Sequence, residues 1–444
     1  MKKKILLMVI VVLFSACGQN HTKKDSKKGL SEAGNVKVRY NIDLTKSYSE
    51  RRFCLQDIAD VEYVALETKE NVLVDDAFEM GVFDSCIVVC NSMKGDFLFF
   101  DMKGKFRSRF NRMGGSGEEY LMISTWLYDD DNQELYVLDN LSQKRMLVYS
   151  ATGQFKREMR FPRDRWFNNY LYNFDDSSLL ALKTDITDYN KYIDSKDIDL
   201  NDYVLLSKKN GEIVFPVKTV RKTVPTSFIM RLNGESINVK IPMGTIIKDG
   251  EDFLISDVSS DTIFLLKKDR RLMPFLVRTP TVSNTKRPIL LEVSLKTDKY
   301  VFLKKTVYDL ESKDMNGFSK SGTILGIDLD KNEIFEPYFY NKDFPNCKSF
   351  NKIQSFSPKD AGKHMGARPI NAYILVDALE KGELSGQLKQ IASTLHEDDN
   401  LVLMILRLKL LAASREESPI PKRNPVFCSL TPPQAAGNAL AEFK

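Results

Sequence analysis

Short hydrophobic segments recur along most of the chain, and many of them alternate with polar residues at every second position. The clearest unit spans residues 123–161 and reads ISTWLYD, ELYVLD, KRMLVYS and QFKREMRF, with short turns between the segments. In the last segment, Phe155, Met159 and Phe161 alternate with charged residues, as expected of a strand with one buried face. Four strands joined by short turns form a meander, which cannot bury both faces alone and must pack on copies of itself.

Four further units of four strands follow the same order and begin near residues 77, 170, 241 and 290. The outer hairpin turns of the five units fall about 50 to 60 residues apart, a period typical of propeller blades with variable loops. These predicted turns lie near Gly104, Gly153, Gly211, Asp269 and Asn332. Five blades are therefore predicted.

The sixth blade is predicted to form from the two ends of the repeat region. Residues 372–378 (AYILVDA) and 401–409 (LVLMILRLK) leave this blade one strand short, whereas residues 61–67 (VEYVALE) stand alone before the first meander. Pairing strand 61–66 with the last blade closes the ring and removes an exposed edge. Leucines at roughly helical spacing predict one helix over residues 379–395. The sequence predicts an all-β, six-bladed β-propeller over residues 43–409, with one helical insertion in the last blade.

Several segments are similar to a known family, above all residues 57–68 (DIADVEYVALET), 99–123 and 135–161. The chain resembles the bacterial six-bladed β-propeller lipoproteins of Gram-negative cells, which share an NHL-like propeller and are largely uncharacterised. The resemblance covers roughly residues 43–409 and implies the same fold. Members of that family often carry Gly-x-Gly-Pro-Gly-Glu-Tyr between the first two full blades. Here Gly114-Gly115-Ser116-Gly117-Glu118-Glu119-Tyr120 has Ser in place of Pro and one additional acid.

The first residues predict export. Three lysines precede an apolar run of about ten residues, which is shorter than the ~20 residues needed to span a bilayer. Ser15-Ala16-Cys17 resembles a lipobox, although Phe14 stands where that motif usually has Leu. We therefore expect residues 1–16 to be a lipoprotein signal peptide and Cys17 to carry a lipid anchor that faces the periplasm, on the outer membrane. An ordinary signal peptide with a chance Cys is the alternative.

Polar, Lys-rich composition predicts a flexible linker over residues 17–42. Residues 410–444 are rich in Pro and show no strand or helix period, which predicts a disordered tail. An altered reading frame or a segment foreign to the protein is the alternative for this tail.

Charge and composition exclude some partners and sites. The 65 Lys and Arg against 60 Asp and Glu give a net charge of +5 over 444 residues, which is too small to predict nucleic acid as the partner. Three histidines without a close pair argue against a His-rich metal site. The five cysteines besides Cys17 are an odd number and imply no complete disulfide framework.

Two segments are candidate binding sites. The glycines Gly114 and Gly117 could aim backbone N–H groups at an anion, although a tight crossing between blades is the favoured interpretation. Glu118, Glu119 and Tyr120 would then lie at the mouth of the ring. Trp, Tyr and Arg residues are enriched at interface hot spots. The second candidate segment contains Arg165, Trp166 and Phe167 and lies in a predicted connection between blades. The alternative is that Tyr170 and Tyr172, which follow this segment, simply begin the innermost strand of the next blade.

Acidic residues are a weaker indication of a calcium-binding site. Residues 185–202 offer Asp194, Asp197, Asp199 and Asp202 as spaced carboxylates but lack the Gly and terminal Glu of an EF-type loop, so a solvated insertion is favoured. Asp328, Asp330 and Asn332 coincide with a predicted hairpin turn, where such residues occur for backbone reasons.

No catalytic residue and no metal ligand is predicted. The sequence contains neither a Gly-x-Ser-x-Gly elbow nor a His-Glu-x-x-His motif. We expect a membrane-anchored binding or interaction module for a protein, peptide or glycan, without a cofactor and without nucleic acid. The alternative is a propeller hydrolase or lyase, of the sugar-lactone or NHL-lyase type, with a carboxylate-bound calcium in its central channel.

Overall fold

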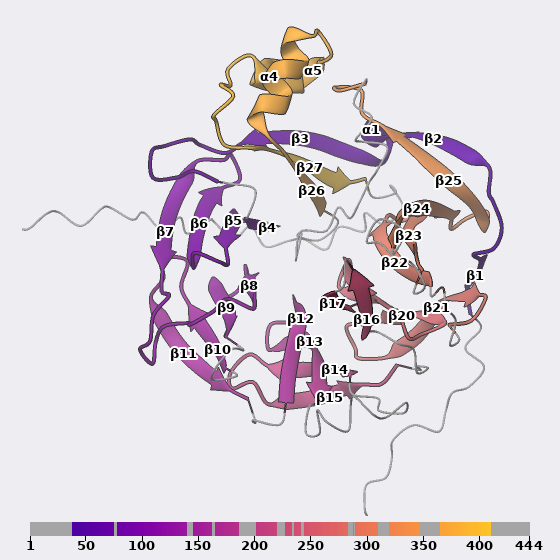
Figure 1. Ribbon diagram of the computed structural model, residues 1–444, viewed down its shortest axis with the longest axis horizontal. Coiled ribbons are helices and arrows are strands. Elements are labelled where there is room, and N and C mark those ends of the chain that lie inside the picture. The colour runs from indigo at the N-terminus through magenta and orange to yellow at the C-terminus, as the bar shows by residue number, and fades with distance from the viewer. Residues whose placement is uncertain are drawn as a thin grey trace, which may run out of the picture. The chain divides into compact units, whose positions relative to one another are not determined.

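The computed structural model describes residues 38–74, 78–139, 145–161, 165–185, 201–219, 227–232, 235–240, 244–282, 287, 289–309, 319–345 and 365–409. Six sheets in this part of the chain form a six-bladed β-propeller, which confirms the predicted fold (Figure 1). The alternation of hydrophobic and polar residues explains this arrangement, because each blade buries side chains against the next one around the ring.

Blades 1 to 3 are antiparallel meanders of four strands each, as the sequence predicts. Blade 1 contains β4 (Glu79–Val82), β5 (Cys86–Asn91), β6 (Asp96–Asp101) and β7 (Phe106–Asn111). Blade 2 contains β8 (Thr125–Asp129), β9 (Glu134–Asp139), β10 (Arg145–Tyr149) and β11 (Phe155–Arg160). Blade 3 contains β12 (Arg165–Asn173), β13 (Ser178–Asp185), β14 (Asn201–Ser207) and β15 (Ile213–Val217).

Blades 4 and 5 repeat the meander and each gain a fifth strand. Blade 4 contains β18 (Gly244–Asp249), β19 (Asp252–Asp257), β20 (Thr262–Leu266) and β21 (Leu272–Thr279). Blade 5 contains β22 (Ile289–Lys296), β23 (Tyr300–Tyr308), β24 (Ser319–Asp328) and β25 (Glu333–Tyr340). The hairpin of β16 (Ser227–Leu232) and β17 (Glu235–Lys240) precedes blade 4 and is absent from the sequence prediction.

The five predicted outer hairpin turns are present, and each has a residue of left-handed backbone. Its φ angle is 80° at Gly104, 78° at Gly153 and 77° at Gly211. The same conformation occurs at Arg270, next to the predicted Asp269, and at Asn332. Glycine adopts this conformation without strain, so the recurrent glycines mark the period of the blades.

The additional strands come from the N-terminal part of the described chain. β1 (Tyr40–Asp43) pairs in parallel with β21, and β2 (Glu50–Cys54) pairs in parallel with β25. The predicted linker over residues 17–42 is therefore wrong at its C-terminal end, because Tyr40 and Ile42 are buried between blades 4 and 5. A strand of four residues is too short for its alternation to stand out from a polar segment.

Blade 6 joins both ends of the propeller. After the short helix α1 (Leu55–Ile58), β3 (Ala59–Ala65) pairs antiparallel with β27 (Val402–Leu408), which pairs in turn with β26 (Met365–Ile370). The ladder joins Val64 to Leu403 and Ala65 to Val402. The N-terminal strand of residues 61–66 thus supplies the outermost strand of this sheet (Figure 1).

The prediction for residues 372–395 is wrong in two respects. Residues 372–378 form helix α4 (Ala372–Glu380) instead of a strand, and α4 and α5 (Gly386–Ala392) replace the single helix predicted over residues 379–395. Ala372, Leu375 and Ala378 are buried at helical spacing, but the continuous apolar run conceals that period. Gly382, with a φ angle of 69°, separates the two helices.

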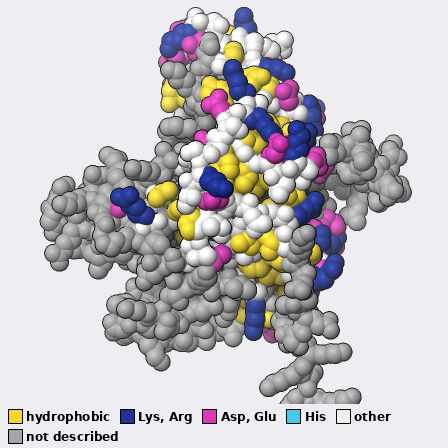
Figure 2. Space-filling model, turned by 90° about the vertical axis from the view of Figure 1, so that its right-hand side faces the viewer, with side chains coloured by type: hydrophobic (Ala, Val, Ile, Leu, Met, Phe, Trp, Pro, Cys, Tyr) yellow, Lys and Arg dark blue, Asp and Glu magenta, His cyan; other side chains and the backbone are white. Residues whose placement is uncertain are grey.

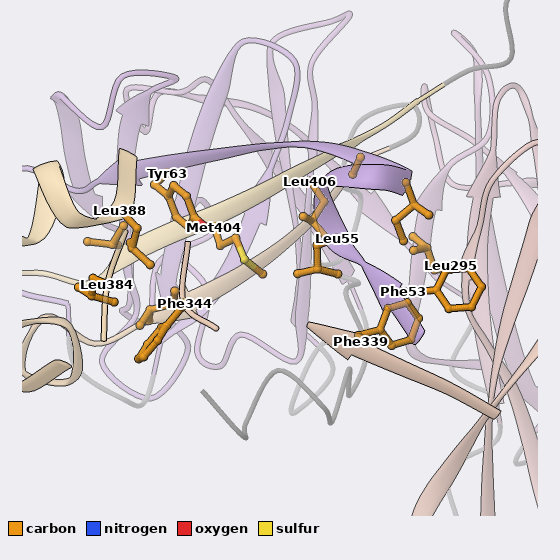
Figure 3. Close-up of a cluster of buried hydrophobic side chains, with 14 of the residues drawn as sticks. Phe53, Leu55, Tyr63, Leu295, Phe339, Phe344, Leu384, Leu388, Met404 and Leu406 are labelled. Atoms are coloured by element: carbon orange, nitrogen blue, oxygen red, sulfur yellow. The ribbon is translucent and has the colours of Figure 1, made fainter. Parts of the chain in front are cut away.

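A hydrophobic cluster fixes the closure of the ring (Figure 3). Phe53 and Tyr63 come from the N-terminal segment, Phe339 comes from blade 5, and Leu388 and Met404 come from the helical insertion and the last strand. Burial of a large apolar side chain contributes about 1.5–3 kcal/mol. This shared core therefore ties the two ends of the described propeller together.

The surface and the helices add two further observations. Among the described residues visible in Figure 2, Lys and Arg side chains are interspersed with Asp, Glu and hydrophobic side chains. Among the described helices, none is long and apolar enough to cross a membrane.

Candidate functional site

The predicted glycine-rich segment lies in the connection between the outer strand β7 and the inner strand β8. We call residues 112–121 the crossing loop. Met113 and Tyr120 form an isolated parallel bridge across its base, so the chain doubles back between them. The crossing loop brings together Gly114, Gly117, Glu118 and Glu119 with Tyr120, as expected of a crossing between blades.

Tyr120 is a buried anchor of the crossing loop, not an exposed ligand at the mouth of the ring as the sequence suggests. Its hydroxyl group donates to the carbonyl oxygen of Gly95 at 2.7 Å and accepts the backbone N–H of Arg112 at 2.9 Å. Burial raises the pKa of Tyr120 far above its ordinary value, so the phenol stays neutral. The loop is thereby attached to the β5–β6 turn of blade 1.

Blade 2 holds the carbonyl side of the crossing loop. Arg145, which is only 1% exposed, donates to the carbonyl oxygen of Gly117 at 2.8 Å and to that of Glu119. The hydroxyl group of Tyr149 donates to the carbonyl oxygen of Glu118 at 2.7 Å. Three successive carbonyl groups are thus turned toward buried donors, which fixes the backbone of the loop.

Two carboxylates balance the buried guanidinium. Arg145 Nε lies 3.5 Å from Asp139 Oδ2, and Arg145 Nη1 lies 3.8 Å from Glu158 Oε1. Asp139 Oδ2 also accepts the backbone N–H of Leu121 at 3.2 Å. We call Arg145, Asp139 and Tyr149 the loop clamp. The sequence offers no local signal for the clamp, because Arg145 stands at the start of an otherwise apolar strand, where a charged residue at the strand end is ordinary.

Some backbone N–H groups of the crossing loop form hydrogen bonds to acceptors within the same loop. Gly114 N donates to the carbonyl oxygen of Tyr120 at 3.1 Å, and Ser116 N donates to Glu119 Oε2 at 2.9 Å. The hydrogen bonds from Ser116 hold the pKa of Glu119 below its ordinary value. The loop therefore supplies its own carboxylate at the position where the sequence suggests an external anion.

Exposed apolar side chains surround the crossing loop, and the sequence prediction did not include them. Met113 is 38% exposed, Leu121 is 40% exposed, and Met93 in the β5–β6 turn is 84% exposed. A Cβ atom at Gly95 would touch Met113, which places the turn of Met93 against the loop. We call Met93, Met113 and Leu121 the apolar patch. No pattern distinguishes these residues in the sequence, since exposure depends on the path of the loop.

The second candidate segment lies in a strand. Arg165, Trp166 and Phe167 begin β12, the inner strand of blade 3, where they pair with residues 183–185 of β13. These three residues therefore lie in a strand instead of the predicted connection between blades, and Tyr170 and Tyr172, which the alternative assigned to the inner strand, belong to the same β12. The ladder is interrupted between Phe167 and Leu171, and this irregularity breaks the alternation in the sequence. The side chains of these three residues lie outside the described part of the structure.

The other candidates for chemistry stay weak. Burial raises the pKa of Cys86 to about 12, so its thiol is protonated and a poor nucleophile. Asp328 Oδ1 accepts the backbone N–H groups of Asp330 and Lys331, as predicted for a hairpin turn. The described residues contain no group of three or more His, Cys, Asp or Glu side chains placed to hold a metal ion. Cys17 and residues 186–200 lie outside the described residues.

Comparisons with known proteins support the fold. Among curated proteins, none matches this chain. The crystal structure of an exported protein from Bacteroides fragilis is 17% identical and has a TM-score of 0.53, with 83% of this chain and 99% of that chain covered. A member of the DUF4221 family from Bacteroides vulgatus is 10% identical and has a TM-score of 0.42, with 80% and 100% covered. The model of a family described as a domain of unknown function, DUF4934, matches residues 39–407, and the chain belongs to this family.

Proposed function

We propose that this chain is an exported lipoprotein that binds a protein, peptide or glycan through the crossing-loop end of its propeller. The observation that supports the proposal is the apolar patch: Met113 and Leu121 are exposed on a loop held by buried hydrogen bonds, and Met93 is exposed on the adjoining β5–β6 turn. Exposed apolar patches on soluble proteins commonly mark interaction sites. Methionine suits such a surface, because its unbranched, polarisable side chain adapts to different partners.

The loop clamp gives the physical reason for placing a binding site here. A loop that is already ordered loses little conformational entropy when a partner binds, so more of the contact energy appears as affinity. Loops on a rigid scaffold are frequent binding sites for the same reason. The crossing loop combines both conditions, since Arg145 and Tyr149 fix its backbone while Met113 and Leu121 stay accessible.

The proposed location rests on the first residues of the sequence. The lipobox-like Ser15-Ala16-Cys17 follows a charged and an apolar segment, and one protein of similar fold is an exported protein. We propose that Cys17 carries the lipid, that the propeller faces the periplasm, and that the outer membrane holds the anchor. In bacteria, Cys17→Ala should abolish labelling by radioactive palmitate and release the protein into the soluble fraction, whereas persistent labelling contradicts the anchor.

Site-specific photo-crosslinking in the native bacterium tests the binding site. A benzophenone amino acid at Leu121 should crosslink a discrete partner, because this side chain is exposed beside the crossing loop. The matched control carries the same amino acid at Val214, which is exposed on the outer strand β15 of another blade. Equal crosslinking at the two positions, or none at Leu121, contradicts a binding site at the crossing loop.

A further inference from the structure

The clamped carbonyl groups determine where the N–H groups of the crossing loop point. In a trans peptide unit the N–H of one residue points away from the carbonyl oxygen of the preceding residue. Because Arg145 draws the carbonyl oxygen of Gly117 inward, the N–H of Glu118 points outward. Within the described residues, no hydrogen bond takes the N–H groups of Gly115, Gly117 or Glu118.

The two glycines leave this row of donors open. A Cβ atom built at Gly115 or at Gly117 meets no other atom within 4 Å, so no side chain shields the backbone there. The apolar patch lies next to the same segment, since Met113 and Leu121 flank it in sequence and Met93 approaches it through Gly95. Proteins bind extended peptides through two elements, backbone groups that form hydrogen bonds with the peptide main chain and a surface that contacts its side chains.

We propose that residues 115–118 and the apolar patch bind an extended peptide segment that carries apolar side chains and a Lys or Arg. The inference rests on the proposed function and specifies its partner. Carbonyl groups of the peptide accept the open N–H group of Gly117 and the outward N–H group of Glu118, and its apolar side chains cover Met93 and Leu121. The clamp is what keeps these donors in one orientation before the peptide arrives.

The charge of the loop favours a basic peptide over an anion. The Glu118 side chain is exposed and forms no ion pair within the described residues, so its carboxylate is available to a cationic partner. Glu119 lies beside it and already occupies the N–H of Ser116. The crossing loop carries these two carboxylates against the single guanidinium of Arg112, whose Nε already donates to the carbonyl oxygen of Gly153 at 2.9 Å, so its charge disfavours a phosphate or carboxylate ligand. A glycan would gain little from the aliphatic surface of the patch, because its hydroxyl groups find no polar partners there.

Peptide binding to the full-length, detergent-solubilised protein tests this inference. The probe is a fluorescent nonapeptide with Val and Lys at alternate positions, and the comparison peptides replace Lys by Glu or Val by Ser. We expect the Val/Lys peptide to bind at least tenfold more tightly than either comparison peptide. Glu118→Lys should reverse the preference between the Lys and Glu peptides. Similar affinities for the three peptides, or an unchanged preference in Glu118→Lys, overturn the inference.

Two further variants separate the backbone donors from the patch. Gly117→Val fits the fold, because a Cβ atom there meets no neighbour, but its side chain shields the open N–H groups and should weaken binding at least tenfold. Met93→Ser should weaken it several-fold, whereas Val214→Ser on blade 3 should leave it unchanged. Full affinity in Gly117→Val overturns the role of the backbone. Crosslinking at Leu121 without any peptide preference overturns this inference and leaves the proposed binding site standing.

Discussion

Replacing Arg145 by Met removes the guanidinium from the loop clamp, leaves the carbonyl groups of Gly117 and Glu119 without this donor, and leaves Asp139 with only the backbone N–H of Leu121. The Arg145 side chain is 1% exposed and contacts two carbonyl groups and the buried carboxylate of Asp139. Methionine has a similar length and fills most of the same space, so the loss is electrostatic rather than a cavity. Arg145→Met therefore isolates the energy of the buried hydrogen bonds and of the ion pair.

The size of the stability loss depends on the charge of Asp139, which stays buried after Arg145 is replaced. Breaking a buried ion pair by removing one partner costs about 3–5 kcal/mol, because the other charge stays desolvated. Part of the cost is recovered, since the carbonyl groups of Gly117 and Glu119 can turn toward water in this exposed loop. We expect Arg145→Met to lower the free energy of unfolding by about 4 kcal/mol, a large share of the roughly 5–15 kcal/mol of a typical domain.

Equilibrium urea unfolding measures this loss. Trp126 is a suitable reporter, because it is buried in the same hydrophobic cluster as Tyr120 and Tyr149. Arg107→Met is the matched control, since Arg107 forms an exposed ion pair with Asp101 and such pairs contribute less than about 1 kcal/mol. The double variant Arg145→Met with Asp139→Leu removes both charges.

The double variant decides whether the reasoning holds. If the stranded charge of Asp139 causes most of the loss, removing it should restore about half of the stability. Peptide affinity should still be weakened in the double variant, because the carbonyl groups of the crossing loop remain unclamped. A cost below about 1 kcal/mol for Arg145→Met, or no recovery in the double variant, would refute the clamp as the element that orders the loop.

Three other predictions concern closure, pH and metal. Val64→Asp buries a charge where β3 closes blade 6 and should lower the free energy of unfolding in urea by at least about 3 kcal/mol. Asp60→Ser on the same strand should lower it by less than about 1 kcal/mol. Equal losses in the two variants would count against closure by β3. Burial alone would raise the pKa of Glu134, but hydrogen bonds from Arg157 and Tyr136 outweigh it and lower the pKa from 4.5 to about 2. A carboxylate with a depressed pKa in the folded state stabilises the fold above its unfolded pKa, so thermal stability should fall as the pH drops from about 4.5 to 2, and Glu134→Gln should flatten this decline. A binding module without calcium should melt at the same temperature with and without EDTA, and a clear loss of stability would favour the calcium enzyme instead.

The blades were predictable because two local signals agree in each of them. Alternating residues specify the strands, and a left-handed turn residue such as Gly104 or Asn332 ends each outer hairpin. The short strands β1 and β2 could not be predicted in this way, because parallel pairing with distant strands leaves no mark in four or five residues. Helix α4 was predicted wrongly for a different reason, since its run of apolar residues is compatible with a strand and with a helix.

The candidate site was predictable only in its position. Consecutive glycines followed by Glu and Tyr indicate an unusual loop, and the crossing loop lies there. The clamp and the apolar patch were beyond the sequence, because both depend on residues from different strands. Arg145 reaches the loop from β10, and Met93 reaches it from the β5–β6 turn. Such contacts between distant segments require the tertiary fold.

The outer strands explain why residues 40–65 belong to the propeller and do not form a flexible linker. β21 and β25 are rich in apolar residues, and β1 and β2 cover their outer edges. β7, β11 and β15 are the outermost strands of their sheets, and an uncovered edge invites pairing with another chain. Arg107 on β7 and Arg160 on β11 place exposed charges there, and Pro216 on β15 has no N–H to donate. β21 and β25 contain Pro274 and Pro337 and are nevertheless paired along their outer edges by β1 and β2, so residues 40–65 are part of blades 4 to 6.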